Sequence, residues 1–256
     1  MTPAAAGRRV RRGVRALLAV VALAASPAYA AHPFLTEDPG TQGAGRFELE
    51  LGFASRVGAP DDPGREGAFT PQFSVGALDD LDLIVQAIFL RRAPADAPVV
   101  QGSGDLVTDV KWRFYENATL ALAVRAGFDL PAGEPATGLG AGRAGWHAVA
   151  IAGVTLGECA VYANAGYLRV NQAGTRANLG YFSVALTRPD DAPLKTFVEA
   201  AIASNPDPAN AQWPAIGRVG AIYTATPWLD VDVGYQARLN RAAARQVWLA
   251  GATLRW

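Results

Sequence analysis

Residues Val247–Trp256 read VWLAGATLRW, and every second side chain from Trp248 to the last residue, Trp256, is apolar. Successive side chains of a β-strand point to opposite faces, so this stretch predicts a strand with one apolar face. A terminal aromatic preceded by alternating apolar residues resembles the signal that the insertion machinery of outer-membrane barrels recognises. Most soluble chains end in a polar, frayed tail instead. We therefore predict a membrane β-barrel with its insertion signal at Trp248, Leu254 and Trp256.

The same alternation recurs from Gly45 onward, in about twelve segments of roughly 9–12 residues, the length of a tilted membrane strand. The connections alternate between short turns, such as Asp79-Asp80, and longer stretches, such as 131–142. This layout predicts an all-β fold: a transmembrane antiparallel up-and-down barrel over residues 45–256, with both termini on the periplasmic side. The segments lie near 46–56, 68–78, 81–91, 104–115, 118–130, 143–156, 159–169, 178–188, 194–204, 215–226, 228–238 and 245–256.

A soluble β-sandwich or a lipocalin-like barrel would show the same alternation, because it also has one apolar and one polar face. Three features favour lipid: the segment length, aromatic residues near the segment ends that would form girdles at the two membrane interfaces, and charges on the face opposite the apolar one, although a soluble barrel also allows the last. The aromatic C-terminus then decides for the membrane barrel. The girdle residues would be Phe47, Trp112, Phe114, Tyr115, Trp146, Tyr167, Trp228 and Trp256.

The first 30 residues predict an export signal. Residues 1–15 carry five arginines and no acid, 16–25 are apolar, and Ala28-Tyr29-Ala30 is a small-x-small cleavage site. We expect cleavage after Ala30 and a destination in the outer membrane of a Gram-negative cell. An uncleaved, membrane-anchored helix is the alternative.

Charged residues fall on the face opposite the apolar one, which would be the lumen of the barrel. Two interpretations stay open: a salt-bridged core that closes a small barrel, or the wall of a narrow aqueous path. Twelve strands leave room for a small path or a plug, because eight strands enclose only side chains and sixteen form wide pores. The predicted lumen-lining residues are Glu48, Glu50, Asp109, Lys111, Arg113, Arg125, Asp129, His147, Glu199, Arg218, Asp230 and Asp232.

Residues 31–44 precede the first predicted strand. We expect a periplasmic segment that caps the barrel or enters its lumen, with Glu37 and Asp38 paired to lumen arginines; disorder is the alternative. His32, Glu37 and Asp38 are spaced too loosely for a metal site, and a single cysteine, Cys159, excludes a thiolate one. We therefore expect no metal and no cofactor.

Other function classes are disfavoured. Without the first 30 residues the chain has 18 basic and 23 acidic residues, a net charge of −5, so a nucleic-acid partner is not expected. An outer-membrane enzyme acting on lipid would need a histidine and a nucleophile within hydrogen-bond reach. His147 and Ser183 are the candidates, and both are predicted to face the lumen rather than lipid, so we do not expect an enzyme.

Several motifs resemble the outer-membrane transporter family named for the meta-pathway of phenol degradation, over most of the chain after residue 31. The resemblance implies an outer-membrane barrel that passes aromatic or other apolar solutes. The apolar strand faces and the aromatic C-terminus predict outer-membrane lipid and the insertion machinery as further partners. It supplies no catalytic residues. The matching stretches are HPFLTEDPGTQGAGRFELELG (His32–Gly52), Gly104-Asp105, Val110–Tyr115, Leu130–Gly133, Gly138–Gly142 and Asn164–Tyr167.

Three functions follow as hypotheses: a channel for small molecules, a lipid-acting enzyme, and a structural barrel with a blocked lumen. The channel leads, and its solute class comes from the family resemblance alone.

Overall fold

The computed structural model describes residues 32–59, 62–189 and 192–256; the predicted signal peptide, residues 1–30, lies outside them. No helix in these ranges is long and apolar enough to cross a membrane. The elements are β1 (Phe47–Ala59), β2 (Asp62–Leu78), β3 (Leu81–Gln86), β4 (Phe89–Ala93), β5 (Val100–Ser103), β6 (Leu106–Glu116), β7 (Leu120–Leu130), the 3-10 helix η1 (Pro135–Thr137), β8 (Gly145–Leu156), β9 (Cys159–Arg169), β10 (Asn178–Arg188), β11 (Leu194–Ala203), β12 (Ala215–Thr226), β13 (Leu229–Arg238) and β14 (Gln246–Arg255).

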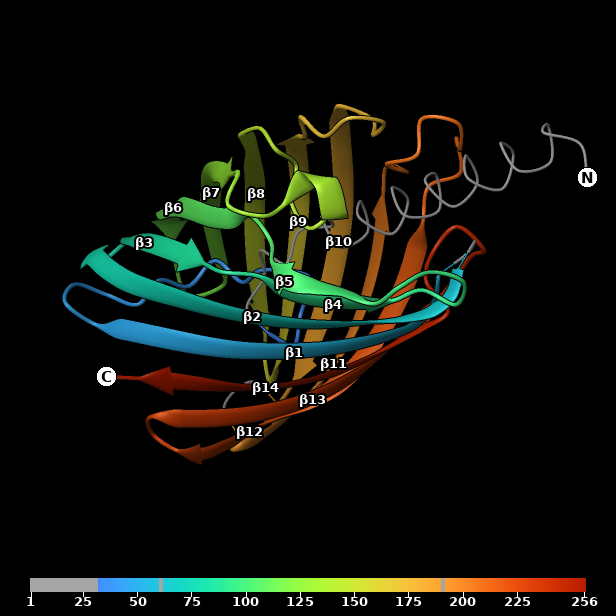
Figure 1. The fold of residues 1–256 in the computed structure, drawn as a ribbon. Helices are drawn as coiled ribbons and strands as arrows, with labels where there is room; N and C mark the ends of the chain where they lie inside the picture. The colour runs from blue at the N-terminus through green and yellow to red at the C-terminus, as the bar shows by residue number, and fades with distance from the viewer. Residues whose placement is uncertain (1–31, 60–61, 190–191) are drawn as a thin grey trace, which may run out of the picture.

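The strands form one antiparallel sheet that closes on itself (Figure 1). Strands β1 and β14 pair from Glu48↔Arg255 to Val57↔Gln246, which joins the two edges. Strands β3 and β4 both pair with β2, while β6 pairs with β3 and β5 with β4. Strands β3 and β4 therefore act as one interrupted strand of the wall, and β5 and β6 act as the next. The predicted 12-stranded, antiparallel, up-and-down barrel is confirmed.

The structure corrects three details of the predicted strands. Segment 81–91 was expected to be continuous, but the ladder is interrupted at residues 87–88. Residues 100–103, expected in the loop between segments 81–91 and 104–115, form β5, and a second interruption at 104–105 separates β5 from β6, which matches the predicted segment 104–115. Pro71 on β2 stands opposite the first interruption and has no N–H to donate, although its carbonyl accepts a 3.0 Å bond from Ala87. The expected loop 57–67 is largely strand, because β1 and β2 stay paired as far as Ala59↔Asp62 across a bulge.

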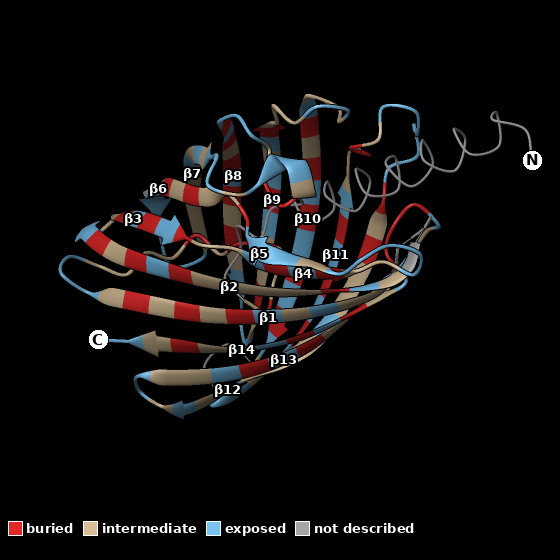
Figure 2. Cartoon of the chain, viewed as in Figure 1, coloured by how far each residue is buried: buried red, intermediate tan, exposed pale blue. Residues whose placement is uncertain are grey.

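The two faces of the wall differ as the alternation predicts, and Figure 2 shows the resulting bands of buried and exposed residues along the strands. Large apolar side chains cover the outside: Phe53 is 51% exposed, Trp248 58% and Val233 60%. Buried polar side chains occupy the alternate, inward positions. A continuous apolar exterior of this kind is typical of a barrel that faces lipid.

Aromatic residues gather near both ends of the barrel exterior. Phe47 stacks with Trp256 where β1 begins, with ring centroids 6.0 Å apart, and the ring centroids of Trp146 and Tyr167 lie 5.1 Å apart at the opposite end. We call these ends the turn end, where β1 begins and β14 stops, and the loop end. Turns of two or three residues join β2 to β3, β6 to β7, β8 to β9 and β12 to β13 at the turn end, while longer connections such as 131–144 and 204–214 cross the loop end.

The inward face is not polar throughout, which alternation alone did not predict. A buried apolar cluster lines the inside of strands β6 to β10. These strands carry apolar residues on both faces over part of their length, so the lumen holds a region that behaves as a hydrophobic core. The cluster consists of Val107, Ala123, Val149, Ile151, Leu168, Leu179 and Tyr181.

Candidate functional site in the barrel lumen

Residues 32–44, which we call the inner segment, lie inside the barrel before the chain enters β1. Wall side chains satisfy its backbone groups. The Glu199 carboxylate accepts a hydrogen bond from the Leu35 N–H at 2.9 Å. Asn164 accepts from the Glu37 N–H at 2.6 Å and donates to the Glu37 carbonyl at 2.9 Å. Buried backbone groups require such partners, so inward polar residues of β9 and β11 fix the path of a segment that belongs to no strand.

A cluster of buried charges joins the inner segment to strands β6, β7 and β8. Arg125 Nη1 lies 2.8 Å from Glu37 Oε2, and Arg125 Nη2 lies 2.6 Å from Asp109 Oδ2. Lys111 Nζ is 3.2 Å from Glu37, and His147 Nε2 is 2.6 Å from Asp109. Buried charges are tolerated when they are paired and hydrogen-bonded, and this cluster gives every carboxylate a cationic or N–H partner.

Two inward glycines make room for the imidazole of His32. Gly52 of β1 and Gly251 of β14 are cross-strand partners. A Cβ at Gly52 would lie 2.7 Å from the ring, and one at Gly251 closer still. The ring reaches Asp232 through Nδ1 at 2.7 Å, and the His32 N–H donates to Glu50 at 2.9 Å. Glycine at this inward pair is therefore required for the ring to reach its carboxylate.

The inner segment leaves the lumen at the turn end. The Gln42 N–H donates to Asp82 at 3.0 Å, and its side-chain amide donates to Glu48 at 2.7 Å. The Ala44 N–H donates to Asp79 at 3.1 Å. The segment thus runs from the middle of the barrel to the start of β1, and it occupies the lumen on the turn-end side.

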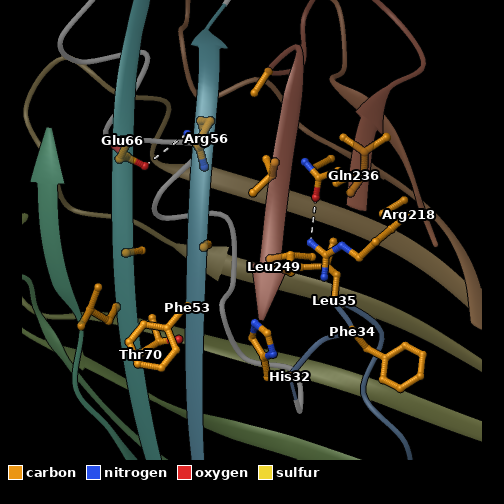
Figure 3. A pocket seen from close by; sticks show the side chains of 18 of the residues that line it. His32, Phe34, Leu35, Phe53, Arg56, Glu66, Thr70, Arg218, Gln236 and Leu249 are labelled. Carbon is orange, nitrogen blue, oxygen red and sulfur yellow. Dashed lines mark hydrogen bonds and ion pairs between the residues drawn. The ribbon is translucent and has the colours of Figure 1, made fainter. Parts of the chain in front are cut away.

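A cavity of about 180 Å³ lies on the loop-end side of the inner segment (Figure 3). His32, Phe34 and Leu35 form its floor, and Phe34 is fixed by a ring contact of 4.3 Å with Phe197. Most of its wall is apolar, with Arg218 and Gln236 among the polar exceptions. The apolar wall residues include Ala68, Ile88, Leu90, Ala201, Ile216, Val247 and Leu249.

Most of the predicted lumen residues are brought together around the inner segment. Asp109, Lys111, Arg125 and His147 form the charge cluster, and Asp129 lies at its edge, 3.4 Å from His147. Glu50 and Asp232 hold His32. Glu199 holds the Leu35 backbone and lies 3.4 Å from Arg218.

Three predicted residues lie nearer the turn end. Glu48 and Asp230 share Arg255, at 2.8 Å and 2.6 Å. Arg113 pairs with Glu116 at 3.3 Å and takes no part in the central cluster. These three therefore form pairs near the rim rather than contacts with the middle of the inner segment.

Several inward polar residues of the wall were not predicted from the sequence. Arg92 of β4 pairs with Glu66 of β2 at 2.7 Å, and both are buried. Gln72 accepts a 3.0 Å bond from Arg125, and Asp82 receives the Gln42 N–H. The period-2 pattern of β2 indicates that Glu66 and Gln72 point inward, but Glu66 lies in the stretch 57–67, for which the sequence predicts a loop.

The candidate catalytic and metal groupings do not assemble: among the described residues the buried Ser183 Oγ has no hydrogen-bond partner. His147 directs its two ring nitrogens to carboxylates, Asp109 and Asp129, and contacts of this kind anchor a polar network. His32 contacts Asp232, whereas Glu37 contacts Arg125. No group of three or more potential metal ligands is present in the part of the chain that the structure describes.

Comparisons with solved structures extend over most of the chain. An outer-membrane channel from Pseudomonas putida F1 aligns with a TM-score of 0.67 at 12% identity, covering 86% of this chain and 98% of its own. The NanC porin aligns at 0.59 and 8% identity, covering 80% and 98%. The KdgM porin, solved in complex with disordered oligogalacturonate, aligns at 0.54 and 6% identity, covering 81% and 98%. At such identities the likeness establishes the fold, which is that of outer-membrane β-barrels.

No protein-family model matches the sequence, and no curated protein matches it.

Proposed function

We propose that this chain is an outer-membrane channel for small molecules and that its inner segment closes the lumen at rest. The apolar exterior and the aromatic residues at both ends support a position in a bilayer. The fold shared with porins and channels supports a path through the barrel. In this proposal residues 1–30 direct export and are removed, and Trp248, Leu254 and Trp256 are read during insertion.

One observation carries the proposal: on its turn-end side the lumen is filled by the inner segment, which polar contacts hold, rather than by an apolar core. Hydrogen bonds and ion pairs hold the inner segment through Glu37, Leu35 and His32. Water can replace such contacts, because a lumen open to solvent offers every freed group a new partner. A segment held in this way can be displaced without unfolding the wall, whose own hydrogen bonds are closed in the ladder.

The proposed path follows the predicted lumen residues, and its solute is a small aromatic or apolar compound. The resemblance to the outer-membrane transporter family of phenol degradation supports this solute class. The apolar cluster around Val149 and Ile151 and the apolar cavity above His32 support it independently. No cofactor or energy source is part of the proposal.

Weakening the hold on the inner segment should open the channel. We expect liposomes carrying a Glu37→Gln, Glu199→Gln double variant to swell several-fold faster in arabinose than those carrying the wild type, because both carboxylates anchor the segment. Glu158→Gln, in an exposed pair with Arg188, is the matched control and should swell like the wild type. Equal swelling of all three proteins, each folded as judged by heat-modifiable migration, would instead support a structural barrel with a blocked lumen.

A further inference from the structure

We propose that the cavity above the inner segment is a binding site for one neutral molecule that combines a single apolar ring with a hydroxyl group, and that His32 receives the hydroxyl. The proposal rests on the proposed channel function and names the class of solute that stops inside it. Three properties of the cavity carry it: its size, its apolar wall, and one ring nitrogen.

The size fits one ring. The cavity measures about 180 Å³. An apolar cavity of about 150 Å³ in another protein binds benzene, so this one accepts a ring with one or two further heavy atoms. Close-packed interiors contain few voids of this size, because the lining atoms lose their dispersion contacts. A ligand that restores those contacts through Ile88, Ile216 and Leu249 is therefore favoured.

The four charged side chains at the cavity already face partners of their own. Arg218 donates to the Pro33 carbonyl and to Gln236, both at 2.7 Å, and its Nε, which makes no hydrogen bond, lies 3.4 Å from the Glu199 carboxylate. Glu50 accepts from Gln72 at 2.9 Å, and Glu66 lies 3.5 Å from Arg56 and 2.7 Å from Arg92. A charged ligand would have to break one of these contacts or be buried without a partner, and either change is costly. The wall thus selects a neutral molecule.

His32 supplies the specific polar contact. Its Nδ1 lies 2.7 Å from Asp232, a carboxylate that can only accept, so Nδ1 carries hydrogen. Within the described residues Nε2 is buried and has no hydrogen-bond partner, and the ring lines the cavity, as Figure 3 shows. In the neutral ring, with hydrogen on Nδ1, Nε2 is an acceptor, and a hydroxyl group can donate to it.

Binding of two isosteric probes tests the site. Benzyl alcohol and ethylbenzene differ only by a hydroxyl in place of a methyl group. We expect the folded full-length protein in detergent to bind benzyl alcohol about tenfold more tightly than ethylbenzene, after correction for partition into micelles, because one buried acceptor gains a hydrogen bond. Isothermal titration gives both affinities, and protein-free micelles of the same detergent give the micelle correction.

Two variants separate the parts of the proposal. His32→Phe keeps a ring of similar shape but removes the acceptor, so the tenfold preference should disappear while ethylbenzene binding is kept. Ile216→Trp fills the cavity and should abolish binding of both probes, and it leaves the inner segment unchanged in sequence. Equal affinity of the wild type for the two probes, or undiminished binding to Ile216→Trp, would overturn the site.

The binding site and the channel function can be rejected independently of each other. Selective binding of benzyl alcohol without faster swelling of the Glu37→Gln, Glu199→Gln variant would leave the site standing and reject the channel. Faster swelling without selective binding would reject the site alone.

Discussion

Replacing Arg125 with alanine should lower the free energy of unfolding by about 3–5 kcal/mol, the cost of leaving a buried charge without its partner. Arg125 is fully buried and holds Glu37 at 2.8 Å and Asp109 at 2.6 Å. The alanine would leave Glu37 with Lys111 and Asp109 with His147, which cannot reproduce the geometry of the guanidinium. Urea unfolding in lipid vesicles measures the change.

Arg188→Ala is the matched control, because Arg188 and its partner Glu158 are 66% and 69% exposed. Exposed pairs contribute only about 0–1 kcal/mol. A loss for Arg125→Ala no larger than for Arg188→Ala would contradict the assigned cluster. A double-mutant cycle between Arg125 and Glu37 then measures how much of the lost stability comes from the contact with the inner segment.

Replacing Val233 with arginine should destabilise the barrel by about 2–4 kcal/mol, the cost of an arginine at the bilayer midplane on the lipid face. Val233 lies at the middle of β13 and is 60% exposed on the outside of the wall. In a soluble barrel the same side chain would meet water, and the arginine would cost almost nothing. Urea unfolding in vesicles again gives the difference.

Val99→Arg makes the same chemical change in the connection between β4 and β5, where Val99 is 51% exposed. We expect little loss at this position because it lies outside the strands. If Val233→Arg proves as harmless as Val99→Arg, the apolar exterior does not face lipid.

Local patterns were enough to predict the strands and their facing. In β6, Asp109 and Lys111 are buried while Val110 and Trp112 are exposed, as period-2 alternation requires. The interruption at residues 87–88 was not predictable from that segment, because its cause, Pro71, lies on a neighbouring strand. A ladder depends on both of its strands, and only their register brings the proline opposite the break.

The sequence could predict which type of residue would pair within the lumen, but not which individual residue. Glu37 was expected to meet a lumen arginine, but its contact with Arg125 spans 88 positions and depends on the path of the inner segment. Asp38 accepts from the Gly40 N–H at 2.7 Å, and its charge acts on Lys111 of the cluster. Glycines at inward strand positions indicate where the inner segment approaches the wall, and the sequence prediction did not use them. Gly153, where a Cβ would lie 2.8 Å from Pro39, marks where the segment passes the wall, as Gly52 does for His32.

The apolar part of the lumen was hidden for a different reason. Strand β10 carries Phe182 and Val184 outside, 56% and 46% exposed, but it also carries buried Leu179 and Tyr181 inside. A strand that is apolar on both faces has no contrast for alternation to detect. The buried apolar cluster and the cavity can therefore be recognised only when the strands are placed around the lumen.

The most direct test of a channel closed by its own inner segment is the ionic current through single barrels in a planar bilayer. It should be recorded for the wild type and for a variant lacking residues 33–42, with heat-modifiable migration showing that both are folded. We expect the wild type to stay closed at low voltage and the shortened variant to give steady current steps. Equal currents from the two proteins would contradict the closure of the lumen by residues 32–44.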